Sequence, residues 1–301
     1  MQDVNGIINV KKKKGYTSFD VVAKLRGILK IKKIGHTGTL DPDAEGVLPV
    51  CIGNATKLCD FLMEKQKEYE AELILGKSTD TQDMSGEVLN ESDNYKNLTE
   101  DVIRDTIRSF VGEIYQTPPM YSALKVNGQK LCDLARKGIT VERKKRKITI
   151  FDIEILKIDL PKVNIRVKCS KGTYIRTLCN DIGEKLGTYG CMGYLLRTGS
   201  GQFLLEDSVK LMEIEKMRDE NSLDKIIIKT ENVLDYKKIT VKMEFDKMLL
   251  NGNVLTYNMA VCEQEVNKSE LVKVYTSQGK FAAIYKKTEN DLFKPEKMFL
   301  V

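Results

Sequence analysis

The chain has 301 residues, of which 42% are hydrophobic and 31% charged, with 21 glycines and 6 prolines. This composition excludes a collagen-like, low-complexity or wholly disordered chain, and the length predicts one large domain with a smaller second one. Lysine and arginine number 49 against 43 acidic residues, for a net charge of +6. An excess of this size points to an anionic partner only if it is concentrated on part of the surface.

Up to about residue 204 the hydrophobic pattern alternates between the helical and the strand period. Thr17 or Ser18 is a suitable N-cap for a first helix whose buried face would hold Phe19, Val22, Leu25, Ile28 and Leu29. The predicted helices lie at about 19–30, 56–63, 100–110, 129–136 and 174–186. The predicted strands lie at about 68–75, 121–126 and 193–204, with two more between 145 and 170. Residues 35–49 are predicted to form a loop, and Asn127-Gly128 is predicted to make a tight turn after the strand at 121–126.

The composition changes past residue 215, where a polar stretch is followed by short alternating segments. Asn251-Gly252 and Gln278-Gly279 are typical of tight turns between strands. We therefore predict a large domain over residues 1–235 and a small β-rich domain over residues 238–301.

The seven cysteines include no Cys-x-x-Cys pair, which argues against a disulfide framework or a zinc ribbon. The first residues, MQDVNGIINV, lack the apolar core of a signal peptide. No run of ~20 apolar residues is present that could span a bilayer. We expect a cytoplasmic protein with reduced thiols and no membrane association.

Two stretches concentrate the positive charge. Residues 11–36 carry nine basic residues against Asp20 alone, and residues 136–147 carry seven against Glu142 alone. The rest of the chain must then be net acidic, and a basic face on an acidic body is typical of nucleic-acid binding. The alternative is a lysine-rich surface that reflects only the composition of the organism's proteins.

The usual catalytic motifs are absent. The acidic stretch from Asp41 opens like a calcium loop but has Ile52 at position 12, where a bidentate glutamate is required. Gly76-Lys77-Ser78 lacks the first glycine of a P-loop, because that position is Ala71. His36 is the single histidine, and neither G-x-S-x-G nor G-x-G-x-x-G occurs. We expect chemistry by carboxylate, tyrosine and arginine, with no metal and no cofactor.

Five blocks occur in an order that resembles the TruB family, the bacterial tRNA pseudouridine-55 synthases. The central block is IGHTGTLDPDAEGVLP at residues 34–49. The others are KEYEA at 67–71, GKSTDTQD at 76–83, TPPMYSALKVNG at 117–128 and CSKGTYIRT at 169–177. The resemblance spans about residues 6–204. Three positions depart from the usual pattern: Lys13 stands in place of proline, Cys132 in place of tyrosine, and Leu196 where a second arginine is common.

The resemblance implies an α/β (α+β) fold with a mixed, largely antiparallel sheet flanked by helices, and a PUA-like RNA-binding domain at the C-terminus. It implies a tRNA pseudouridine synthase that isomerises one uridine of the T-loop after flipping it out of the RNA. We expect the protein to be a monomer. The partner would be the T-arm stem-loop of tRNA.

Asp41 is the predicted nucleophile. Pseudouridine formation breaks the bond from ribose C1′ to uracil nitrogen and remakes it to C5, with no redox change and no energy input. An ionised carboxylate can attack C1′ or C6, or stabilise charge as the bond breaks. The residues leave the attacked atom open. Turn chemistry alone would make Asp41 simply the start of an Asp-Pro turn.

The resemblance implies roles for five more side chains, each of which also has an ordinary structural interpretation. His36 would stack into the gap left by the flipped uridine, and Tyr69 would face the uracil. If residues 172–176 are extended, Tyr174 and Arg176 lie on one face, where Arg176 would pair with Asp41. Leu195 would line the pocket. The alternatives are a structural histidine, a core tyrosine, a surface ion pair and a core leucine.

The basic stretches would hold phosphates of the T-arm stem. The predicted contacts are Lys12, Lys13, Lys14, Arg143 and Lys145. Three alternative functions are kept: a non-catalytic RNA-binding protein on the same scaffold, a retaining glycosidase that uses Asp41 with a second carboxylate, and the same chemistry on a guide-directed or messenger RNA.

Overall fold

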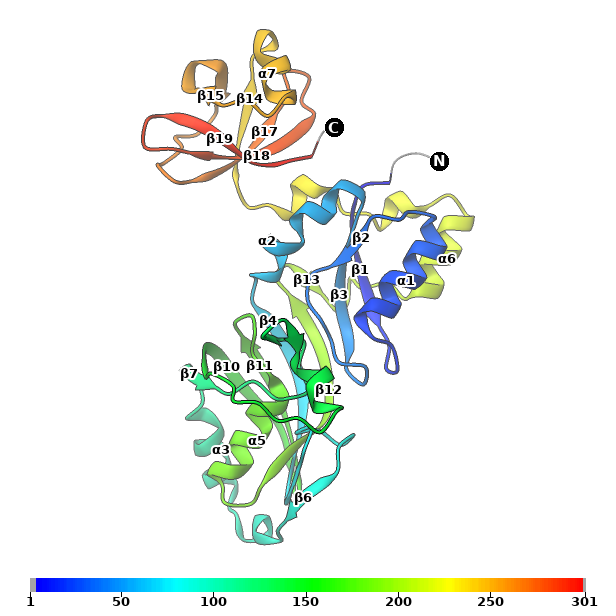
Figure 1. Ribbon diagram of the computed structural model, residues 1–301, viewed down its shortest axis with the longest axis vertical. Helices are drawn as coiled ribbons and strands as arrows, with labels where there is room; N and C mark the ends of the chain where they lie inside the picture. Colours follow the sequence, from blue (N-terminus) through cyan, green and yellow to red (C-terminus); the bar gives the residue numbers. More distant parts are fainter. Residues whose placement is uncertain (1–3, 300–301) are drawn as a thin grey trace.

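The computed structural model describes residues 4–299, and its elements form an elongated molecule with a small domain at one end (Figure 1). A nine-stranded sheet runs through the larger part of the molecule. Seven of its strands follow the order β1-β3-β12-β4-β11-β10-β7, and the other two are β2, which pairs with β3, and β13, which pairs with β12. Its strands are β1 (Gly6–Lys12), β2 (Ile34–His36), β3 (Glu45–Ile52), β4 (Lys67–Leu75), β7 (Gly112–Gln116), β10 (Arg146–Asp159), β11 (Lys162–Cys169), β12 (Gly190–Ser200) and β13 (Phe203–Leu204). The helices beside it are α1 (Ser18–Leu29), α2 (Cys59–Met63), α3 (Glu100–Arg108), α5 (Ile175–Lys185) and α6 (Leu211–Asp219).

The large sheet consists of two halves joined at one short seam. Every strand pair in it is antiparallel except β3 with β12, which meet in parallel at Glu45–Leu196 and Gly46–Arg197. Gly46 has a φ of +105°, and a Cβ added there would lie 2.2 Å from the carbonyl oxygen of Arg197. Only glycine fits this position. The predicted mixed, largely antiparallel sheet is therefore confirmed, and the seam places residues 37–44 between the two halves.

Helix α1 begins where its sequence predicts. The Thr17 side chain accepts from the backbone of Asp20, whose carboxylate accepts from the backbone of Thr17 in a capping box. The buried face differs by one position from the prediction, because Val21 is buried whereas Phe19 is 63% exposed. Helix α6 packs beside α1 and adds Ile214 to the same core.

The helices and strands behind the second half of the sheet follow their sequence signals closely. Thr99 caps α3 through the amide of Val102, and α5 covers predicted residues 174–186 almost completely. Their buried residues pack on β4, β10 and β11 in one core. Packing in this core therefore fixes the position of the first turn of α5.

Two predictions of local structure were wrong. Residues 35–49 were expected to form a loop, but β3 begins at Glu45 and is buried on both faces, so that it lacks the alternation that marks a half-exposed strand. Residues 121–126 were expected to form one strand, but only β8 (Lys125–Val126) does so.

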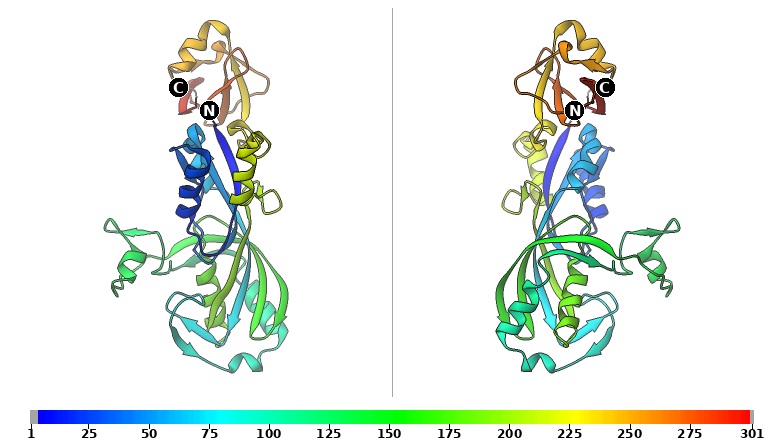
Figure 2. Two further views of the ribbon diagram at one scale, coloured as in Figure 1. Left: turned by 90° about the vertical axis from the view of Figure 1, so that its right-hand side faces the viewer. Right: turned by 90° about the vertical axis from the view of Figure 1, so that its left-hand side faces the viewer.

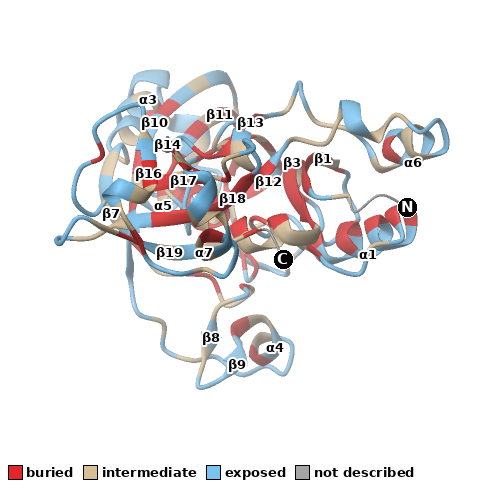
Figure 3. Cartoon of the chain, turned by 90° about the horizontal axis from the view of Figure 1, so that it is seen from above, coloured by how far each residue is buried: buried red, intermediate tan, exposed pale blue. Residues whose placement is uncertain are grey.

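The predicted Asn-Gly turn lies in an insert, residues 117–145, that projects from the body of the molecule (Figures 2 and 3). Asn127 and Gly128 have φ of 49° and 81° and connect β8 to β9 (Gln129–Lys130), which leads into α4 (Leu131–Ala135). A second small hairpin pairs β5 (Lys77–Thr79) with β6 (Val88–Glu91).

The second sheet holds six strands in the order β15-β19-β18-β17-β14-β16. They are β14 (Lys237–Val241), β15 (Leu255–Thr256), β16 (Ala260–Cys262), β17 (Leu271–Tyr275), β18 (Phe281–Lys287) and β19 (Leu292–Met298), with α7 (Asp246–Leu250) beside them. A β-rich C-terminal part is thus confirmed, whereas its PUA-like role and the boundary at residue 235 stay predictions. Within residues 4–299, none of the helices has the length and apolar character needed to cross a bilayer.

Candidate active site

Asp41 lies in the loop that crosses the seam of the large sheet, and this loop is held from several sides. The amide of Leu40 donates to Ser18 Oγ at 2.9 Å, which ties the loop to the first turn of α1. The ammonium of Lys12 donates to the carbonyl of Pro42 at 3.0 Å, and the amide of Ala44 donates to the carbonyl of Asp41. The loop therefore presents the Asp41 carboxylate in one defined direction.

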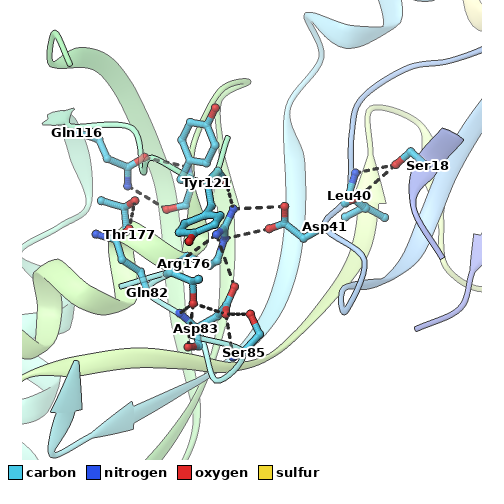
Figure 4. Close-up of polar contacts among 12 residues, drawn as sticks. Ser18, Leu40, Asp41, Gln82, Asp83, Ser85, Gln116, Tyr121, Arg176 and Thr177 are labelled. Carbon is cyan, nitrogen blue, oxygen red and sulfur yellow. Dashed lines mark hydrogen bonds and ion pairs between the residues drawn. The ribbon is translucent and has the colours of Figure 1, made fainter. Parts of the chain in front are cut away.

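Arg176 meets Asp41 from the other half of the sheet (Figure 4). Its Nε lies 3.0 Å from Asp41 Oδ2 and its Nη2 lies 3.3 Å from Oδ1, so the pair is bidentate. The same guanidinium donates to the carbonyls of Thr81 and Tyr121 and lies 3.5 Å from Asp83 Oδ2. The predicted ion pair between Arg176 and Asp41 is present.

The backbone that carries Arg176 differs from the extended form considered above. Tyr174 is extended and forms the N-cap of α5, but Arg176 already belongs to the first turn of that helix. Gln116 holds this start of the helix, because its side chain donates to the carbonyl of Tyr174 and accepts from its amide. Arg176 therefore points to Asp41 because of helix geometry and not because of a strand period of two.

Opposing effects act on the Asp41 carboxyl. Burial raises its pKa, the adjacent Arg176 guanidinium lowers it, and the nearby carboxylate of Asp83 raises it again. The side chain is still 39% exposed, so one part of it faces open space. A carboxylate that is poorly hydrated, held by arginine and open on one side is well placed to act as a nucleophile.

Asp41 and Arg176 form part of the wall of a cavity of about 590 Å³, which lies in the size range of small-molecule sites. The cavity is also lined by Tyr69 on β4, Tyr174 at the start of α5 and Leu195 on β12. The structure thus brings together five of the six residues predicted around the substrate.

The sixth residue, His36, ends β2 one position before the lining stretch that begins at Thr37. Its Nδ1 accepts from the amide of Gly38 at 3.3 Å. Burial lowers the pKa of its imidazole, and the charge of Arg197 lowers it further. His36 is therefore a neutral, half-buried ring at the edge of the cavity.

The predicted phosphate contacts divide into two groups. Lys13, Lys14 and Lys145 are exposed, as a phosphate contact requires. The prediction for Lys12 was wrong: its side chain is 1% exposed, and its ammonium donates to the carbonyls of Lys13, Tyr16 and Pro42. Arg143 is partly buried and donates to the carbonyl of Pro118 at the base of the insert.

Sequence reasoning missed two charged residues of the site. Asp83 lies at the end of a recognised block but was given no role, and it adds a second carboxylate on Arg176. Arg197 also lines the cavity and is 1% exposed, yet it was noted only for the unusual leucine before it. Their pattern in the chain carries no signal of this, because both acquire their partners through packing.

Comparisons with known proteins agree with one another. Residues 26–175 match a family model described as "TruB family pseudouridylate synthase (N terminal domain)", and residues 176–235 match one described as "tRNA pseudouridylate synthase B C-terminal domain". A protein of Clostridium perfringens named tRNA pseudouridine synthase B is 48% identical over 299 residues, which is 99% of each chain. A protein of Lachnoclostridium phytofermentans with the same name is 50% identical over 309 residues, covering 99% of this chain and 100% of that one.

Two solved structures extend the comparison to the fold. A chain of an H/ACA RNP bound to a substrate RNA containing 2′-deoxyuridine has a TM-score of 0.75 and 27% identity, covering 98% of this chain and 85% of that one. A chain of an archaeal box H/ACA sRNP Nop10-Cbf5 complex has a TM-score of 0.73 and 30% identity, covering 98% and 86%.

Proposed function

The chain belongs to the TruB family of pseudouridine synthases. We therefore propose that its substrate is one uridine in the T-loop of tRNA, recognised within the T-arm stem-loop. The enzyme is an isomerase that converts uridine in tRNA to pseudouridine. The observation that carries the proposal is the bidentate pair of Asp41 with Arg176 on the wall of a cavity shared with Tyr69 and Leu195.

The reaction needs a nucleophile that stays ionised without being strongly hydrated. Attack of the Asp41 carboxylate on ribose C1′ expels uracil through its nitrogen, whereas attack on C6 makes a covalent adduct with the base. In the second route the C1′–N bond then breaks within the adduct. In both routes the base turns, C5 bonds to C1′, the bond to Asp41 breaks and frees the carboxylate, C5 loses its proton and the former glycosidic nitrogen gains one. Arg176 keeps Asp41 charged and aimed before the attack and again once the carboxylate is released.

The other cavity residues would hold the flipped nucleoside. Tyr69 offers an aromatic face and a hydroxyl group, Tyr174 adds a second aromatic ring to the lining, and Leu195 would supply an apolar surface beside the uracil. A stacked base cannot reach such a cavity, so the uridine must leave the RNA stack. His36, as a flat neutral ring at the cavity edge, is suited to fill the gap it leaves.

The exposed lysines would bind the stem beside the T-loop. Lys13 and Lys14 precede Gly15, whose amide donates to the carbonyl of Pro42 in the loop that carries Asp41, and Lys145 is the last residue of the projecting insert. Phosphate contacts of this kind position the RNA without reading its sequence. We further propose that the enzyme works as a monomer in the cytoplasm and that the C-terminal sheet is a PUA-like RNA-binding domain.

The test is tritium release from 5-tritiated uridine in a T-arm hairpin, with the products separated by chromatography. We expect release by the wild type and none by Asp41→Asn, while Asp43→Asn, an exposed position in the same loop, keeps full activity. Full activity of Asp41→Asn would refute the nucleophile. Free uracil as the product would indicate a glycosidase. Binding without release would indicate a non-catalytic protein, or, if activity appears only with an added guide RNA, a guided enzyme.

A further inference from the structure

Arg197 is a buried cation at the centre of the site, and no carboxylate lies within ion-pair distance of it in residues 4–299. Its Nε donates to the carbonyl of Val47 at 2.6 Å and its Nη2 donates to that of Gly38 at 3.3 Å. These two carbonyls lie on either side of Asp41 in the loop and strand that cross the seam. The guanidinium therefore holds both ends of the segment that carries the nucleophile.

The same side chain also reaches the other half of the sheet. Arg197 on β12 is the direct antiparallel partner of Tyr69 on β4, so the two side chains are close neighbours on one face of the sheet. The backbone of Arg197 forms the parallel pair with Gly46. One residue thus holds the Asp41 segment and lies beside Tyr69 at the same time.

Hydrogen-bond chemistry fixes the direction of this contact. A guanidinium has only donors, so in any hydrogen bond between the two side chains the phenolic oxygen of Tyr69 is the acceptor. Burial raises the pKa of the Tyr69 hydroxyl, and Arg197 offsets only part of this, so the tyrosine keeps its proton. An oxygen that accepts from Arg197 leaves its own O–H free to donate into the cavity that both residues line.

We propose that Arg197 is a positioning residue, which turns the Tyr69 hydroxyl toward the flipped nucleoside as a hydrogen-bond donor and holds it in register with Asp41. The proposal rests on the proposed function, because it assigns the nucleoside to this cavity. Arg197 itself makes no contact with the RNA backbone: its side chain is 1% exposed, and its donors are directed to protein acceptors.

The test is a double-mutant cycle on the rate of pseudouridine formation at saturating T-arm RNA. Arg197→Met should lower this rate by about tenfold or more when Tyr69 is present, and by only about threefold or less in the Tyr69→Phe background. The dissociation constant of the RNA should change by less than about threefold, because a buried residue acts on the rate and not on binding. Arg166→Met, on the exposed face of β11, should change neither quantity.

If Arg197→Met lowers the rate by the same factor with Tyr69 and with Tyr69→Phe, the proposal is overturned, because a merely structural role of Arg197 would not depend on the Tyr69 hydroxyl. A larger dissociation constant of the RNA with an unchanged rate would overturn the proposal as well, because Arg197 would then act in RNA binding. If circular dichroism shows that Arg197→Met is unfolded, Arg197→Lys replaces it in the cycle and must show the same dependence on Tyr69. A wild type that makes no pseudouridine refutes the proposed function, whereas an active wild type with additive losses refutes only this inference.

Discussion

Removal of the Arg176 guanidinium is the perturbation whose consequences the structure defines best. Arg176→Met would leave Asp41 and Asp83 facing each other without their common cation. Hydrogen bonds to charged groups contribute ~1.5–3 kcal/mol each, so the two bonds to Asp41 amount to ~3–6 kcal/mol. Because Asp41 is 39% exposed, water replaces part of this, and a loss of about 3 kcal/mol corresponds to roughly a 150-fold lower rate.

The pH dependence separates charge from geometry. Asp41 must be ionised to act, so the rate rises with pH as this group loses its proton. Arg176 lowers the pKa of Asp41, and its removal shifts the acidic limb of the rate profile to higher pH. Arg176→Lys keeps the charge but not the bidentate geometry, so we expect a slower enzyme whose acidic limb lies near that of the wild type.

The assay is single-turnover tritium release from a T-arm hairpin across the pH range in which the RNA stays folded. Arg166→Met, which removes an arginine from the exposed ion pairs with Glu70 and Glu154, is the control and should match the wild type. A rate for Arg176→Met within about threefold of the wild type, with an unmoved acidic limb, would refute the reasoning.

Three further predictions concern the seam, the buried lysine and the RNA surface. Gly46→Ala should lower the urea-unfolding free energy by about 3 kcal/mol or more, because its Cβ would strike the Arg197 carbonyl, whereas Gly15→Ala, with a φ of +82° but open space around it, should lose only about 1 kcal/mol. Burial lowers the pKa of Lys12 to about 8, so between pH 8 and pH 10.5 the folded state binds fewer protons than the unfolded state. Over this pH range the unfolding free energy of the wild type should therefore rise relative to that of Lys12→Met. Parallel curves of unfolding free energy against pH would contradict the burial of the Lys12 ammonium. The affinity for T-arm RNA should fall steeply with salt, with the logarithmic slope reduced by about one for each glutamine placed at an exposed basic position; filter binding would contradict this if slopes were unchanged for Lys13→Gln, Lys14→Gln and Lys145→Gln.

Local signals predicted much of the fold because they act over a few residues. Thr17 and Asp20 form a capping box three positions apart in the chain, and Asn127-Gly128 makes its turn with both residues at positive φ. Strand β3 escaped prediction for a physical reason: burial on both faces removes the alternation by which a strand is recognised.

The candidate site was predicted in its members but only partly in its arrangement. Asp41, Tyr69 and Arg176 were identified through blocks that resemble a known family, and the structure places all three around one cavity. A helix was predicted around Arg176, but its pairing with Asp41 was expected from an extended backbone, and the second carboxylate at Asp83 was not predicted. These features depend on the approach of α5 to a loop more than 90 residues away in the chain.

The neighbouring residues Lys12 and Lys13 show most clearly what the sequence determines by itself and what only the tertiary structure decides. Composition and blocks of residues identified a basic, RNA-directed chain with an aspartate at its catalytic loop, since residue types and short spacings are properties of the chain itself. Lys12 and Lys13 are identical in type and neighbours in sequence, yet one is buried on three carbonyl oxygens and the other is exposed. Tertiary structure decided between them, as it decided the place of Arg197, because burial and charge pairing are set by segments that meet only when the two halves of the sheet come together.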